Sequence, residues 1–256
     1  MKALFSKNII KQSIRNNLKL WSVLTVVLCF FITVLTVAIN ARQGSARFGA
    51  NAGNMESTYA RIFFNTIGLC GIMMLIYANS VGNKLVAGEI DKGTMSFTLN
   101  TPVTRKQVIL SKMLFHMISL VAMIVLVGAF GTAASSVVGA DVDSGKLWNV
   151  VLGFLCYSFA ISGICFFSSC WFNKSGQALI VGTGFPVAFF LLSTLSSLIT
   201  INDKEFLKYL SLNTLYDTNA ILSGEGFVAQ FIVLFVSGAV LYSIGVVRFL
   251  RKDLPL

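Results

Sequence analysis

The sequence GEIDKGTMSFTLNTPVTRKQVILSKML, which runs from Gly88 to Leu114, is the most polar long stretch of an otherwise apolar chain. An uncharged run of 22 residues (62–83) ends just before it, and an uncharged run of 28 residues (113–140) begins within its last residues. A helix needs about 20 apolar residues to cross the hydrocarbon core of a bilayer. The polar stretch is therefore predicted to be a loop between two membrane-spanning helices.

The same arrangement of charge clusters and uncharged runs extends over the whole chain of 256 residues. Only 12% of the residues are charged and 55% are hydrophobic, with a mean hydropathy of +0.79, whereas a soluble domain has about 25% charged residues. Strands of a membrane barrel are excluded because they alternate in polarity over about 10 residues. The sequence predicts an all-α integral membrane protein, one domain over 1–256, with six spans at 20–41, 62–83, 113–140, 147–173, 175–202 and 226–247.

The distribution of basic residues predicts how the spans are oriented. With the N-terminus inside, the inner segments hold 14 of the 20 Lys and Arg residues, and the outer segments hold seven of the ten acidic residues. Lys and Arg are enriched in cytoplasmic loops. We therefore expect both termini in the cytoplasm, although the three arginines at 42, 47 and 61 run against the rule in the first outer loop. The net charge of +10 follows from this placement and does not indicate nucleic-acid binding.

The first 19 residues predict a basic amphipathic helix on the inner membrane surface. Lys7, Lys11, Arg15 and Lys19 recur every four residues, and apolar residues fill the other faces. Such a helix lies in the interface with its apolar face toward the acyl chains. Lipid phosphates are the expected partners, and contact with a cytoplasmic protein is the alternative.

The sequence offers no convincing catalytic or metal-binding set. The single histidine, His116, falls near the inner end of the third expected span, and the five cysteines all fall inside expected spans. Proton relays and ion-coupled transporters place ionisable groups at mid-depth, and the six uncharged runs contain none. No nucleotide-binding motif of the form G-x-x-x-x-G-K-[ST] occurs. Packing is thus the expected role of the cysteines, packing or a place at the membrane interface is the expected role of the histidine, and no cofactor is expected in this chain.

The stretch from Gly88 to Leu114 contains residues that favour turns and a helix start. Gly88 and Gly93 can permit turns, and Pro102 restricts the residue before it to an extended conformation. Thr104 can cap a helix that begins at Arg105 and continues into the third span. An ordinary solvated connector with capped ends would show the same features.

Together these residues resemble a known pattern. The order Glu89, Gly93-Thr94, Leu99, Pro102, Arg105 and Lys112 is similar to the loop between spans two and three of the ABC-2 type exporter permeases. The motif covers about 25 residues, and the six-span architecture extends the resemblance over the chain. It implies that this loop forms coupling helices that contact an ATP-binding subunit through Glu89, Gly93, Thr94, Pro102 and Arg105.

The resemblance implies further features. It implies a second copy of this chain or a close homologue, and two ATP-binding cassette subunits that hold ATP and Mg²⁺. It implies outer re-entrant helices in segment 203–225 before the last span. It also implies that spans two and five line the pathway, with candidate lining residues Asn65, Thr66, Asn79, Phe185, Pro186, Phe189 and Phe190. Hydrogen bonding between helices and contact with lipid are the alternative roles of these residues.

The resulting hypothesis is an export permease of a bacterial plasma membrane. The absence of charge in the spans favours an amphipathic or hydrophobic substrate, such as a peptide, a lipid-like molecule or a drug, with a peptide as the first choice. A membrane anchor or sensor subunit that transports nothing is the alternative. A membrane-embedded enzyme is disfavoured.

Overall fold

The computed structural model describes residues 5–46, 55–99, 103–137, 144–198 and 227–252, together with 212, 215, 216 and 221. Side chains are described within these ranges except at 35, 38–46, 55–69, 99, 144 and 194–198. The regular elements in these ranges are helices: α1 (Lys7–Ala46), α2 (Met55–Leu85), α3 (Ala87–Asp91), α4 (Met95–Leu99), α5 (Arg105–Val137), α6 (Ser144–Trp171), α7 (Ser175–Leu198) and α10 (Phe227–Arg251).

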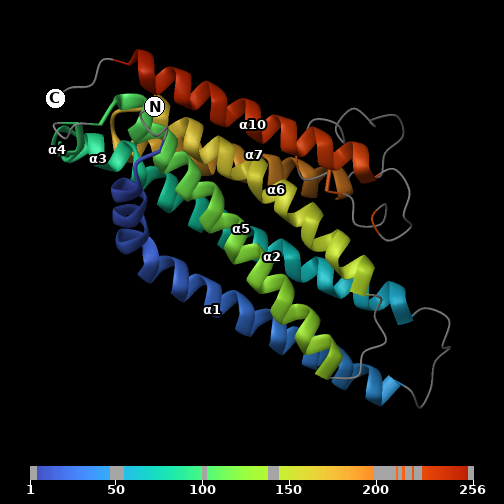
Figure 1. Cartoon of the computed structure of the whole chain (residues 1–256). Coiled ribbons are helices and arrows are strands. Elements are labelled where there is room, and N and C mark those ends of the chain that lie inside the picture. The colour runs from blue at the N-terminus through green and yellow to red at the C-terminus, as the bar shows by residue number, and fades with distance from the viewer. Residues whose placement is uncertain are drawn as a thin grey trace.

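The long helices form an elongated bundle. Helix α1 packs along α5, α10 packs along α6, and α2 lies between the two pairs with contacts to α1, α6 and α7 (Figure 1). The short helices α3 and α4, the beginning of α1 and the end of α10 gather at one end of the bundle (Figure 1). This end, called the α3–α4 end below, brings the polar opening stretch together with both ends of the described chain.

Five of the described helices are long and apolar enough to cross a membrane: α1, α5, α6, α7 and α10. The remaining expected span, 62–83, lies within α2, which is a continuous helix of 31 residues whose side chains are described only from Cys70 onward. The multi-pass, all-helical architecture is confirmed for the described residues, whereas the count of six spans stays a prediction. The expected re-entrant helices of 203–225 fall almost entirely outside the described residues.

The N-terminal region forms one continuous helix, α1, whose first turns run at an angle to the remainder (Figure 1). The sequence predicts an interfacial helix over 1–19 and a span that begins at residue 20, and the position of the first turns on the membrane surface stays a prediction. Neither glycine nor proline occurs between Lys7 and Arg42 to interrupt α1, so the backbone bonds continue through the bend.

Hydrogen bonds between buried polar side chains connect the helices of the bundle. The buried His116 of α5 shares a hydrogen bond of 3.1 Å with the hydroxyl of Tyr242 on α10, which donates to Ser162 on α6 at 3.0 Å. Inside a bilayer, buried polar groups need partners from neighbouring helices. The expected packing role of His116 is confirmed, and all five cysteines are free thiols.

Pro186 lies inside α7, which continues through it. A proline has no backbone N–H, so the carbonyl four residues earlier loses its helical partner. That carbonyl belongs to Gly182, and it accepts a bond from the Cys165 thiol of α6 at 3.5 Å. A Cβ on Gly182 would lie 2.3 Å from Asn79 Oδ1 and 2.8 Å from Ser168 Oγ. An alanine at position 182 would therefore force the buried Asn79 and Ser168 side chains to shift where α7 meets α2 and α6.

Candidate functional site

The α3–α4 end contains a compact junction built from the opening stretch. Helix α2 ends at Leu85, and the chain turns at Val86 to enter α3. The Glu89 and Ile90 amides both donate to the Val86 carbonyl, at 3.2 and 3.1 Å. The turn leaves Ala87 fully buried and Glu89 partly exposed on the same short helix.

Gly93 shapes the turn from α3 to α4. Its φ of +69° lies in the left-handed region that favours glycine. Its N–H donates to the Ile90 carbonyl at 3.0 Å, and its own carbonyl accepts the Ser96 hydroxyl at 2.6 Å. The Thr94 hydroxyl donates back to the Glu89 carbonyl at 3.2 Å. Glu89, Gly93 and Thr94, three residues of the expected coupling set, therefore belong to one turn.

Helix α5 begins as the sequence predicts. The Gln107 amide donates to the Thr104 hydroxyl at 3.3 Å, and the Thr104 amide donates to the Gln107 side chain at 2.9 Å. This reciprocal pair is a capping box, which satisfies two backbone donors at a helix start. Arg105, the first residue of α5, is exposed beside it. Pro102 lies outside the described residues.

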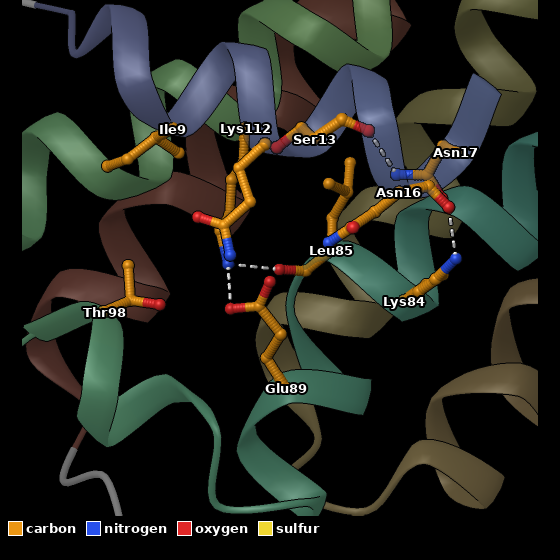
Figure 2. Close-up of a pocket in the computed structure, with 10 residues that line it drawn as sticks. Ile9, Ser13, Asn16, Asn17, Lys84, Leu85, Glu89, Thr98 and Lys112 are labelled. Carbon is orange, nitrogen blue, oxygen red and sulfur yellow. Dashed lines mark hydrogen bonds and ion pairs between the residues drawn. The ribbon is translucent and has the colours of Figure 1, made fainter.

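The centre of the junction is an ion pair. Lys112 of α5 is 1% exposed, and its ammonium donates to Glu89 Oε2 at 2.5 Å and to the Leu85 carbonyl at 2.6 Å (Figure 2). Met95 Sδ lies 3.9 Å from the same nitrogen. The Glu89 side chain is 25% exposed. One lysine therefore joins the end of α2, α3 and α4 to the membrane-spanning helix α5.

A small cavity of about 20 Å³ adjoins this pair. Figure 2 shows the first part of α1 crossing over it, with Ser13, Asn16 and Asn17 on the side opposite Glu89. Lys84, near the end of α2, donates to the Asn16 carbonyl at 2.6 Å. The beginning of α1 is thus attached to the same junction.

Two further bonds attach α3 to the helices on its other side. The Ala87 amide donates to Ser169 Oγ of α6 at 3.0 Å, and the Ser175 amide, at the start of α7, donates to Asp91 Oδ2 at 3.3 Å. Together with Lys112, these bonds connect α3 to α5, α6 and α7. A displacement of α3 would therefore act on three spanning helices at once.

The outward surface of the junction is polar with one apolar projection. Asp91, Lys92 and Thr94 are exposed, and Phe97 of α4 has 75% of its surface exposed. An exposed aromatic residue among charged neighbours is a common anchor of protein interfaces. This surface can receive a protein partner, while the buried side of the same helices contacts the bundle.

A second lysine at this end fixes the end of α6. Lys252, just after α10, donates to the carbonyls of Cys170 and Trp171 at 3.2 and 2.8 Å, and Arg248 lies 4.6 Å from the centre of the Trp171 ring. The last carbonyls of a helix lack internal partners. Burial lowers the pKa of the Lys252 ammonium to about 8.

The structure changes the interpretation of Glu89. The resemblance implies that Glu89 contacts an ATP-binding subunit, whereas the observed ion-pair partner is Lys112 of the same chain. The buried lysine needs a counter-charge, and Glu89 is the residue that α3 brings to it. Among the expected coupling residues that the structure describes, Arg105 and Thr94 have exposed side chains available to a partner.

The expected pathway residues do not form one described surface. Asn79 is 3% exposed and donates to the Leu179 carbonyl at 3.2 Å, so the helix-to-helix alternative holds for it. Pro186 is buried, Phe189 is half-buried, and Phe185 is 56% exposed on α7. Asn65 and Thr66 lie on α2 where side chains are not described, so their lining role stays a prediction.

Several residues of the junction were not predicted from the sequence: Leu85, Met95, Phe97, Ser169 and Ser175. The motif already contains both Glu89 and Lys112, but they are 23 residues apart, so the sequence does not show that they pair. No signal marks the serines either, because nothing in their local sequence shows that α6 and α7 pass beside α3.

Comparison with known proteins agrees with this architecture. A family model described as ABC-2 family transporter protein matches residues 7–254, which include every described helix. No curated protein matches the chain. The chain belongs to the ABC-2 family of transporter proteins.

Proposed function

We propose that this chain is the membrane-spanning permease subunit of an ATP-driven exporter, and that the α3–α4 end faces the cytoplasm. ATP and Mg²⁺ would be held by two ATP-binding cassette subunits, and a second permease copy or a close homologue would complete the membrane part. The family match supports the permease assignment. The excess of basic residues in the segments at this end supports the orientation.

The observation that carries the proposal is the attachment of α3 to three spanning helices. A loop that merely connected α2 to α5 would not need a lysine that is 1% exposed, nor bonds to Ser169 and Ser175. A partner that moved α3 would displace α5, α6 and α7 through these bonds. Phe97 and Arg105 are the exposed residues that we assign to the contact with that partner.

The distribution of charged side chains in the spanning helices supports the proposed substrate class. In the described portions of the spanning helices, charged side chains are confined to the ends, so an ion or a highly charged solute would find no counter-charge at mid-depth. We propose an amphipathic or hydrophobic substrate, with a peptide as the first candidate. The bond from Asn79 to the Leu179 carbonyl of α7 supports the alternative role of this residue, hydrogen bonding between helices.

The test begins with purification of the tagged full-length chain from its own membranes in mild detergent. The proposal expects an ATP-binding cassette protein to co-purify, and it expects the reconstituted complex to move a fluorescent amphipathic peptide across vesicles in an ATP-dependent, vanadate-sensitive way. A complex that hydrolyses ATP but moves no member of a panel of peptides, lipids and dyes would instead support an anchor or sensor subunit. Purification without any ATPase would overturn the proposal.

A further inference from the structure

An apolar groove lies between the first half of α1 and α5, separate from the Glu89–Lys112 junction. Its volume is about 200 Å³, and it opens to the outside of the bundle. Ile14, Leu18 and Ile118 line it and are 44%, 52% and 57% exposed. Asn17 and Ser119 are its polar residues. The groove is thus open, elongated and almost entirely apolar.

The groove runs from the start of α1 toward the middle of the bundle. Its lining begins at Ile10 and continues to Trp21, which is a helical rise of roughly 16 Å. Trp21 is held at the deep end because its indole N–H donates to the Ser119 carbonyl of α5 at 2.9 Å. This length corresponds to a large part of one acyl chain.

Positive charge borders the shallow end. Lys7 and Lys11 are exposed on α1, and Lys11 lies three residues before Ile14 and seven before Leu18. Residues at these separations lie along one side of a helix, so the lysines flank the exposed edge of the groove. The sequence has no acidic residue before Glu56. Within the described part of the chain, no ion pair involves either lysine.

We propose that this groove binds one anionic phospholipid of the surrounding leaflet. One acyl chain lies between α1 and α5 and reaches Trp21, while the phosphate group contacts Lys7 and Lys11. A zwitterionic lipid would bring its own ammonium group to this rim, so the two lysines discriminate against it.

The groove and the junction share Asn17, which lines both. A bound lipid would therefore press on the part of α1 that covers the Glu89–Lys112 pair. The lipid site does not depend on the transport assignment, because the binding measurement below requires neither ATP nor a substrate.

The experiment measures quenching of Trp21 fluorescence by lipids that carry bromine on an acyl chain. The full-length protein with Trp148→Phe and Trp171→Phe retains Trp21 as its single tryptophan. It is reconstituted in phosphatidylcholine with a minor fraction of brominated phosphatidylglycerol or, separately, of brominated phosphatidylcholine. If this background does not fold, the spectrum of Trp21→Phe is subtracted from that of the wild type.

We expect brominated phosphatidylglycerol to bind at least tenfold more tightly, since each basic contact with an anionic surface is worth about fivefold. Lys7→Gln combined with Lys11→Gln should abolish the preference. Lys174→Gln is the matched control, because Lys174 is exposed at the turn between α6 and α7, away from the groove lining, and should leave the preference unchanged.

A second variant tests the acyl-chain part. Ala122→Phe fills the deep end of the groove and should reduce quenching by both brominated lipids while the lysines remain. Equal quenching by the two headgroups in the starting protein would overturn the proposal. So would a phosphatidylglycerol preference that survives removal of both lysines, because general attraction to the basic surface would then explain it.

Discussion

Separate removal of Glu89 and Lys112 should have unequal effects, because the two charges are buried to different extents. Lys112 is 1% exposed, whereas the Glu89 side chain is 25% exposed. Glu89→Ala leaves a buried ammonium with the Leu85 carbonyl as its close partner, and loss of a buried counter-charge costs about 3–5 kcal/mol. Lys112→Met leaves the Glu89 carboxylate, which can rotate toward water. The loss of the hydrogen bonds that the Lys112 ammonium donates costs about 1–3 kcal/mol.

A double variant shows whether Glu89 and Lys112 act as an ion pair or contribute to stability independently. Replacing a buried ion pair by groups of similar volume is often nearly neutral. Glu89→Gln combined with Lys112→Met should therefore be more stable than Glu89→Ala alone. Asp91→Asn is the matched control, since Asp91 is an exposed carboxylate on the same short helix and its charge should contribute no more than about 1 kcal/mol.

The assay is thermal unfolding of the purified complex, with ATP hydrolysis and transport measured on the same preparations. We expect the order wild type, Asp91→Asn, double variant, Lys112→Met and Glu89→Ala, from most to least stable. Glu89→Ala should also lose transport before it loses ATP hydrolysis, because α3 would no longer be attached to α5. Equal destabilisation by the two single substitutions, or a double variant no more stable than Glu89→Ala, would refute this account of the pair.

Three further predictions test the packing, the α6 end and the orientation. Gly182→Ala should prevent the close approach of α7 to Asn79 and lower the yield of folded protein, whereas alanine at the exposed Gly184 should not; equal yields would contradict the packing argument. Burial lowers the pKa of Lys252 to about 8, so between about pH 8 and 10.5 the unfolded chain binds more protons than the folded chain. The wild type should therefore gain stability relative to Lys252→Met as the pH rises through this window. A relative loss of stability would show that the charged bonds to α6 outweigh burial. In a background without cysteine, a cysteine at position 144 should react with an impermeant thiol reagent on intact cells and one at position 96 should not, and labelling of position 96 alone would reverse the orientation.

The sequence was sufficient for the elements whose signals are local. Uncharged runs of 22 to 28 residues predict the long helices, because the bilayer requires that length of apolar chain. Thr104 predicts the start of α5, because a capping residue binds within its own turn, and the structure adds the reciprocal bond from Gln107. Gly93 is predicted as a turn residue and is observed with positive φ.

The features of the fold and of the site that the sequence did not predict depend on contacts between distant segments. Charge clustering divided the N-terminal region into a surface helix and a span, but nothing in the backbone interrupts α1. The sequence places Glu89 in a motif without showing that Lys112, 23 residues later, lies beside it. Ser169 binds α3 from 82 residues away, and its position follows only from the packing of α6 against α2.

The central claim is that the α3–α4 turn contacts an ATP-binding subunit, and site-specific photo-crosslinking in intact cells tests it most directly. A photoreactive amino acid replaces Phe97, which is 75% exposed on α4, or Val137, which is 86% exposed at the opposite end of α5. The account predicts an adduct between position 97 and the ATP-binding cassette subunit, and none from position 137. An ATPase adduct from position 137, or adducts from position 97 with lipid alone while the ATPase remains bound to the complex, would contradict the claim.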